Sequence, residues 1–144
     1  MIERRRLTHV VVDTGVASWL LDPRPSPHAE EARRVVGGRS RVASFVTVTE
    51  FRYGALRAGW GELRRRQLER SLADLEVIQT SEALIDRCAS LRAELSRAGH
   101  ALAQKIHEAD RWVAATAVAL NLELVAGDGI FENVAGLDVR RGCR

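Results

Sequence analysis

Four acidic residues are the chain's best candidates for chemistry: Asp13, Glu50, Asp110 and Asp128. Carboxylates crowded into one cleft repel one another, and their pKa values rise unless a cation joins them. A hard divalent ion with oxygen ligands is the natural partner, and Mg²⁺ prefers one or two carboxylates, several waters and substrate phosphates. In such a site one ion can activate water while another steadies the leaving oxygen of a phosphodiester. If the fold brings the four acids together, they predict metal-assisted phosphodiester hydrolysis.

Each acid also has an ordinary structural interpretation. Asp13, in VVVDTG, could cap the helix that follows it. Glu50 lies three residues after Thr47, which is the spacing of a capping box. Asp110 lies near the start of a helix, where the helix dipole favours an anion. Asp128 precedes a glycine, and Asp-Gly is a common turn dipeptide.

The segment HEADRWVAATAVAL, His107–Leu120, favours a chemical role for Asp110. At helical spacing, Asp110 shares a face with Val113, Ala114 and Ala117, and the rest of the helix is also apolar. A helix that is apolar all round is buried. A carboxylate on its packed side therefore needs a partner.

Short apolar strands alternate with helices along the chain. This pattern predicts an α/β fold, a single domain over residues 1–144 with a parallel sheet covered by helices on both faces. In such sheets, ligands bind outside the carboxyl ends of the strands, where the strand order reverses. The first expected strand ends just before Asp13, and Asp128 follows another by two residues. The expected strands are His9–Val12, Val42–Phe45, Glu76–Gln79, Leu122–Ala126 and Leu137–Arg140. The expected helices are Thr14–Leu21, a helix from Pro27 to the Gly37-Gly38 pair, Val48–Ala58, Glu62–Leu75, Glu82–Arg97 and one within His107–Leu120.

The composition is that of an ordinary globular protein, with 46% hydrophobic and 28% charged residues in 144. No apolar run approaches the roughly 20 residues needed to cross a membrane. The apolar run after the first basic residues is too short for a signal peptide. Cys88 and Cys143 fit neither a zinc site nor a disulfide scaffold. We therefore expect a reduced, cytoplasmic location and no membrane partner.

The net charge is +3, and Lys105 is the single lysine among 22 basic residues. Arginine suits bidentate contacts to phosphate, so a nucleic-acid partner is one interpretation. A solvated, arginine-rich surface is the other. The arginines cluster at Arg4–Arg6, at Arg64–Arg66 with Arg70, and at Arg140, Arg141 and Arg144.

Four blocks of the sequence, in order, resemble PIN-domain ribonucleases of the VapC toxin type. They are VVVDTGVASWLL, VTVTEFRYGAL, HEADRWVAATAVALN and ELVAGDGIFENVAGLDV. The resemblance implies a PIN domain with a five-stranded parallel sheet flanked by helices on both faces. It also implies an endoribonuclease that depends on Mg²⁺ or Mn²⁺. Such a protein would form a homodimer, and a small VapB-type antitoxin would hold it inactive in a heterotetramer or larger complex.

The resemblance also assigns roles to residues. Asp13, Glu50, Asp110 and Asp128 match the family's acidic quartet, with the three aspartates as metal ligands. Thr14 keeps the hydroxyl that follows the first acid. The sequence departs from the family at Ala126, where a Thr or Ser often stands two residues before the last acid.

Three residues of the Asp110 helix or its start could support the site. Arg111 could contact substrate phosphate, or it could be a surface charge. The Thr116 hydroxyl could bond to a site carboxylate, or only back to its own helix. His107 could reach a phosphate or a water, although a surface or structural role is the plainer interpretation.

Other functions and surfaces stay open at this stage. Phe51, Tyr53 and Leu56 could form a dimer or antitoxin surface, or pack in the core. A PIN nuclease that is not a toxin and acts on structured RNA or DNA is one alternative function. A catalytically inactive PIN module that binds RNA or protein is another.

Overall fold

Five parallel strands form the centre of the computed structural model, which describes residues 2–142. The order across the sheet is β3-β2-β1-β4-β5, so the expected five-stranded parallel sheet is confirmed. The expectations that concern Cys143 and Arg144 fall outside the described residues. The strands are β1 (His9–Val12), β2 (Ser40–Ser44), β3 (Glu76–Ile78), β4 (Leu124–Ala126) and β5 (Val139–Arg141).

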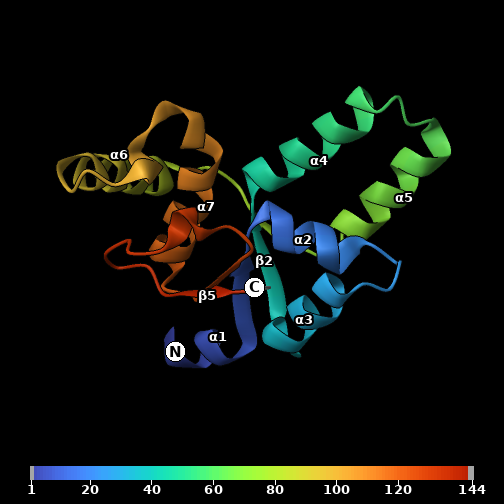
Figure 1. Cartoon of the computed structure of the whole chain (residues 1–144), viewed down its shortest axis with the longest axis horizontal. Helices are drawn as coiled ribbons and strands as arrows, with labels where there is room; N and C mark the ends of the chain where they lie inside the picture. The colour runs from blue at the N-terminus through green and yellow to red at the C-terminus, as the bar shows by residue number, and fades with distance from the viewer. Residues whose placement is uncertain (1, 143–144) are drawn as a thin grey trace.

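Helices cover both faces of this sheet (Figure 1). One layer contains α6 and α7, the other contains α2 and α3, and α4 and α5 extend as a pair beside the sheet. None of the helices in residues 2–142 combines the length and apolar character that crossing a bilayer requires. The helices are α1 (Ile2–Thr8), α2 (Thr14–Leu21), α3 (Pro27–Val36), α4 (Phe45–Arg57), α5 (Glu62–Leu72), α6 (Glu82–Arg97) and α7 (Glu108–Leu120). Short 3₁₀ helices are η1 (Ala101–Ala103), η2 (Lys105–His107) and η3 (Gly129–Phe131).

The central strand β1 shows why the sheet holds both layers. Val10 and Val12 pack into the cluster beneath α2 and α3, while Val11 packs into the cluster beneath α6 and α7. All three side chains are completely buried. Successive strand residues point to opposite faces, so a run of β-branched residues buries both sides of a parallel sheet.

Several predicted boundaries differ from the structure by one to three residues, and the one between β2 and α4 matters most: Phe45 begins α4 and does not end β2. The hydroxyl of Ser44 accepts a hydrogen bond from the backbone N–H of Val46 at 3.3 Å, which makes Ser44 the cap of the helix. The capping box proposed for Thr47 and Glu50 is wrong for the same reason. Thr47 already lies inside α4, and both side chains point to other partners described below.

The helix α1 has no counterpart among the predicted elements. Two of its arginines form ion pairs with opposite edges of the sheet region. Arg5 pairs with Glu76 on β3 at 3.1 Å, and Arg6 pairs with Asp138 just before β5 at 2.7 Å. Part of the amino-terminal arginine cluster is therefore engaged within the chain.

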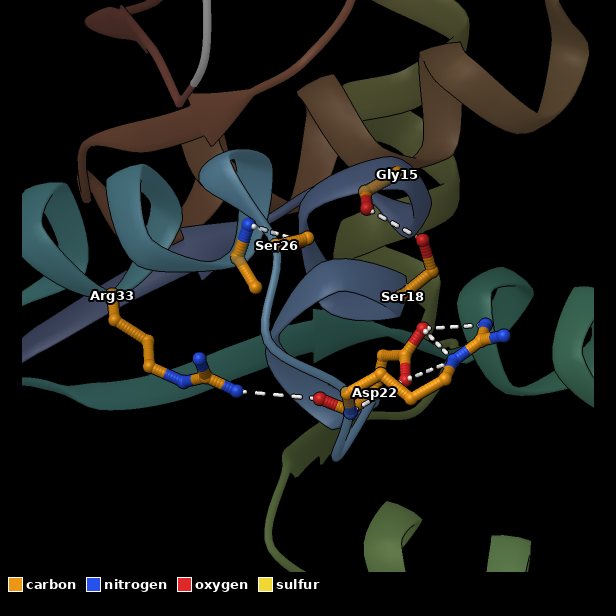
Figure 2. Close-up of polar contacts among 7 residues, drawn as sticks. Gly15, Ser18, Asp22, Ser26 and Arg33 are labelled. Atoms are coloured by element: carbon orange, nitrogen blue, oxygen red, sulfur yellow. Dashed lines mark hydrogen bonds and ion pairs between the residues drawn. The ribbon is translucent and has the colours of Figure 1, made fainter.

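The connection between α2 and α3 is held by polar contacts, as Figure 2 shows. Arg24 donates to the Asp22 carboxylate, and this bond lowers the pKa of Asp22 to about 2. Arg33 donates to the Asp22 carbonyl at 3.3 Å. Ser26 caps α3 by accepting from the N–H of Ala29 at 3.0 Å, which confirms the predicted start of that helix. These contacts fix the far end of α2, the helix that begins directly after Asp13.

Candidate active site

The candidate site lies where the strand order reverses, between β1 and β4. The chain continues from β1 to β2 on one side of the sheet, and only later supplies β4 on the other side. Asp13 follows β1, and Asp128 follows β4 by one intervening glycine. Asp110 lies in the first turn of α7, which packs against β1 and β2. The topology therefore gathers three carboxylates that are far apart in the sequence.

Asp13 is the most buried of these acids, with 6% of its surface exposed. Its Oδ1 accepts from the backbone N–H of Val16 at 2.7 Å, which caps α2. Its Oδ2 accepts from the N–H of Gly127 at 3.1 Å, in the loop after β4. The capping role is confirmed, and the same side chain also ties β1 to the loop that carries Asp128.

The environment raises the pKa of Asp13 above its ordinary value of 3.8. Burial is the largest cause, because removal from water disfavours the charged carboxylate. The hydrogen bonds from Val16 and Gly127 act in the opposite direction, while the negative charges of Asp110 and Asp128 add to the rise. Asp110 and Asp128 are thus close enough to Asp13 for their charges to act on it.

Asp110 projects from a helix that is otherwise part of the core. Five consecutive residues of α7, Val113–Ala117, are buried, so the expected core helix is confirmed. The side chain of Asp110 keeps 36% of its surface exposed, and its Oδ2 lies 3.2 Å from Nδ1 of His107. Asp110 makes no capping bond at the start of α7. The side chain of Asp110 therefore contacts His107 and does not cap the helix.

Glu50 is connected to the site through a pair of hydroxyl groups. The Thr14 hydroxyl donates to Oε1 of Glu50 at 2.8 Å and lies 3.0 Å from the Thr47 hydroxyl. This network joins the start of α2 to the first turns of α4. Glu50 itself is exposed, and it is not among the groups that shift the pKa of Asp13. It stands at the rim of the aspartate group.

Asp128 is exposed at the start of η3. Its Oδ1 accepts from the backbone N–H of Ile130 at 3.0 Å, so the turn interpretation is also confirmed. This bond uses one carboxylate oxygen and leaves the other without a partner in the described part of the chain.

Arg111 and Thr116 face other parts of the protein. Arg111 is 2% exposed, which excludes the surface-charge interpretation. Its Nη1 donates to the carbonyl of Leu102 at 3.0 Å and to that of Gln104, so it holds the segment before α7. Burial lowers the pKa of Arg111. The Thr116 hydroxyl donates to the Trp112 carbonyl at 2.8 Å, which is the bond back to its own helix.

The donor set suits a divalent cation that water and substrate help to hold. Within residues 2–142, no Arg or Lys side chain pairs with Asp13, Asp110 or Asp128, and their one basic neighbour is His107, whose Nδ1 lies 3.2 Å from Oδ2 of Asp110. No group of three or more His, Cys, Asp or Glu side chains in that range is arranged to hold a metal ion by itself. Mg²⁺ usually takes only one or two carboxylates and completes its octahedron with water and phosphate oxygens. The residues therefore fit an ion whose ligands are partly carboxylates and partly water and substrate oxygens, and they do not form a site made of protein ligands alone.

Sequence reasoning missed the contribution of Arg141, which was grouped with the carboxyl-terminal arginine cluster. Its Nη2 donates to the carbonyl of Gly127 at 2.9 Å, next to Asp128. The signal in the sequence was weak, because only the pairing of β5 with β4 brings this arginine to the loop.

Comparisons with known proteins agree with this geometry. Residues 10–137 match the family model of the PIN domain. No curated protein matches the chain. Among solved structures, VapBC2 from Rickettsia felis bound to a promoter DNA fragment is 21% identical, with a TM-score of 0.75, over 93% of this chain and 98% of that one. DNA-bound VapBC from Salmonella typhimurium is 24% identical, with a TM-score of 0.72, over 94% and 99%. FitAcB from Neisseria gonorrhoeae is 23% identical, with a TM-score of 0.71, over 92% and 97%. At these identities the likeness establishes the fold.

Proposed function

The chain belongs to the PIN-domain family, and from this premise we propose that it is a metal-dependent endoribonuclease of the VapC toxin type. PIN domains are nucleases, hydrolases that act on phosphodiester bonds. One observation carries the proposal for this chain. Asp13, Asp110 and Asp128 come together at the reversal of strand order, and no Arg or Lys in the described part of the chain pairs with them.

The three aspartates would hold one or more Mg²⁺ or Mn²⁺ ions together with water and substrate oxygens. When bound, the ion would neutralise the carboxylates and act as a Lewis acid toward the scissile phosphate. The Asp13 carboxylate is already oriented by two backbone N–H groups, so little reorganisation is needed there.

Glu50 is the carboxylate best placed to handle a proton. The Thr14 hydroxyl fixes its Oε1, and the side chain is exposed at the rim. Its other oxygen would accept a proton from the attacking water. The water oxygen bonds to phosphorus, the bond to the 3′ oxygen breaks, and the 3′ oxygen takes up a proton from solvent water, which leaves a 5′-phosphate and a 3′-hydroxyl.

We also propose a VapB-type antitoxin as partner, and a homodimer that binds it in a heterotetramer or larger assembly. The similar structures from Rickettsia felis and Salmonella typhimurium are VapBC complexes, which supports the antitoxin. In this chain, a groove of about 650 Å³ lies between α4 and α5 and includes Leu56 and Leu68. Tyr53 and Leu56 are 61% and 63% exposed, whereas Phe51 packs against the core. Exposed apolar side chains favour a protein partner, and charges of that partner would pair with the six charged residues that also line the groove: Arg52, Glu62, Arg65, Arg66, Glu69 and Arg70.

The test is cleavage of an end-labelled single-stranded RNA by the purified chain in Mg²⁺, in Mn²⁺ and in EDTA. The Asp13→Asn and Asp110→Asn variants are compared with Asp86→Asn, which changes an exposed aspartate on α6. We expect cleavage only with the metals. The two site variants should lose at least about 100-fold in rate, because the charge stabilisation that they disrupt is worth several kcal/mol. Asp86→Asn should cut like the wild type.

Two results would contradict the proposal. Cleavage by Asp13→Asn and Asp110→Asn at the wild-type rate would exclude the aspartates from the reaction. Cleavage of a matched DNA strand in preference to the RNA would exclude the ribonuclease assignment while leaving a nuclease.

A further inference from the structure

We infer that Arg141, on β5, is a positioning residue that holds the Asp128 loop in place. The inference rests on the proposed function, since it concerns an aspartate of the proposed site. Arg141 spans the loop from end to end. Its Nη2 donates to the Gly127 carbonyl at 2.9 Å, and its Nη1 donates to Oε1 of Glu132 at 3.2 Å.

The bond to Gly127 acts directly on the peptide that enters Asp128. The carbonyl of Gly127 and the N–H of Asp128 belong to the same peptide group, so Arg141 anchors the backbone of Asp128. The N–H of Gly127 donates to Oδ2 of Asp13 at 3.1 Å. Gly127 is therefore held from both sides, by Asp13 and by Arg141. This arrangement couples the positions of the two aspartates.

Other contacts hold the later part of the loop: Phe131 is completely buried in the core, and Nε2 of His100 lies 2.7 Å from the Glu132 carbonyl oxygen. Around Asp128 itself, Oδ1 of Asp128 accepts from the N–H of Ile130, and the N–H of Glu132 donates to the Gly129 carbonyl at 3.1 Å. Both bonds are internal to the loop, so they shape it without fixing it to the sheet. At the Gly127–Asp128 end, the guanidinium of Arg141 attaches the loop to β5, and the Asp13 carboxylate attaches it to the end of β1.

The packing around Arg141 leaves it little freedom. A Cβ atom added at Gly129 would lie 3.1 Å from its Nη1, so the loop backbone rests closely on the guanidinium. At the neighbouring Gly142, an added Cβ would lie 2.8 Å from Cγ2 of Val16 and 3.0 Å from Cγ1 of Val125. The backbone next to Arg141 is thus pressed against α2 and β4, which fixes the point from which its side chain starts.

The Nε atom of Arg141 is buried and makes no hydrogen bond, the only such side-chain atom found in residues 2–142. A buried donor without a partner costs free energy. The guanidinium keeps this orientation nonetheless, with its two outer nitrogens on the loop. A buried donor without a partner is rare in folded proteins and calls for an explanation. Here the explanation is that the other two nitrogens of the guanidinium attach the loop.

The geometry requires the fork of an arginine. One planar group must meet a carbonyl and a carboxylate at the same time, whereas the ammonium of lysine is a point charge on a flexible chain. We therefore compare wild type with Arg141→Met and Arg141→Lys. The matched control is Arg140→Met, which changes the adjacent, exposed arginine whose nearest carboxylate is Glu123 at 3.6 Å.

The first measurement is hydrogen–deuterium exchange of residues 127–132 without metal, after circular dichroism shows that each variant is folded. We expect faster exchange in this loop for Arg141→Met and Arg141→Lys, and wild-type exchange for Arg140→Met. Unchanged exchange in Arg141→Met would overturn the inference, whatever the activity of the chain.

The second measurement is RNA cleavage over a Mg²⁺ titration. Arg141→Met should lower kcat on the order of 10–100-fold, as expected for a misplaced site group, with KM for RNA within about twofold. Arg141→Lys should not restore kcat. A raised KM with unchanged kcat would show that Arg141 binds RNA, and full activity of Arg141→Lys would show that only its charge matters; either overturns the inference. If wild type cuts no RNA, the proposed function fails, and the exchange experiment still decides the role of Arg141.

Discussion

Asp13 both caps α2 and carries a charge, and two substitutions separate these roles. Asp13→Ala leaves the N–H groups of Val16 and Gly127 without their acceptor. Each buried donor left unsatisfied costs about 1–3 kcal/mol, so the two cost about 2–6 kcal/mol. Because Ala also removes the buried negative charge, we expect the free energy of unfolding to fall by about 2–4 kcal/mol. Asp13→Asn keeps one acceptor oxygen and loses one bond, about 1 kcal/mol, but it also removes a buried negative charge. Its stability at neutral pH should therefore lie within about 1 kcal/mol of wild type.

The difference between Asp13→Asn and wild type should depend on pH. Burial raises the pKa of Asp13 in the folded chain above its ordinary value of 3.8, and Asp110 and Asp128 contribute to the rise. The folded state therefore prefers the protonated carboxyl. The stability that this preference gives is fully present below pH 3.8 and is lost as pH rises through the folded pKa. Asn cannot ionise, so the free energy of unfolding of Asp13→Asn should rise relative to that of the wild type as the pH goes from acid to neutral.

The assay is urea unfolding of the wild type and both variants in EDTA, at an acidic pH near 4 and at about pH 7. Asp86→Asn serves as the exposed control. The reasoning is refuted if Asp13→Ala proves as stable as Asp13→Asn, because the two hydrogen bonds would then contribute nothing to the free energy of unfolding. It is equally refuted if Asp13→Asn loses stability relative to wild type as pH rises.

Three further substitutions test other contacts. In Gly127→Ala, the new Cβ would lie 2.9 Å from Cη2 of Trp19, so we expect a loss of about 1–3 kcal/mol in thermal unfolding; an unchanged melting temperature would contradict this packing. Thr14→Val removes the bond to Glu50 and should lower kcat for RNA about tenfold, with little change in stability; full activity would show that Glu50 needs no orientation. Arg111→Met removes the bonds to two carbonyls before α7 and should cost about 1–3 kcal/mol in unfolding. Limited proteolysis should then cut residues 101–107 faster, and unchanged resistance would count against this role of Arg111.

The sheet could be predicted because its strands are short β-branched runs, and burial on both faces leaves that pattern in the sequence. The boundary at Phe45 could not be predicted in the same way. Phe45 continues the apolar run of β2, and only the hydroxyl of Ser44 turns the chain into a helix there. The helix α1 was missed because its ion pairs reach Glu76 and Asp138, which are distant in sequence.

The aspartates could be expected at one edge of the sheet because strand ends and a buried helix point there, and their role as site residues stays a prediction. The sequence did not show which partner each arginine binds. Arg111 and Arg141 bind backbone carbonyls of loops, and every residue offers a carbonyl, so no residue type signals the partner. Arg140 and Arg141 are neighbours, yet the exposed Arg140 meets the largely buried carboxylate of Glu123 and Arg141 meets the Asp128 loop.

The order in which the chain is synthesised gives the topology a further consequence. Asp13 emerges from the ribosome well before its partner loop, which follows β4, and before Arg141, which lies on β5. The aspartates can meet only after β4 pairs with β1, when almost all of the described residues have been made. A nascent chain therefore carries its first carboxylate without a completed site until β4 has been made and has paired with β1. For a protein proposed to cut RNA, this topology delays activity while the chain is still beside the messenger that encodes it.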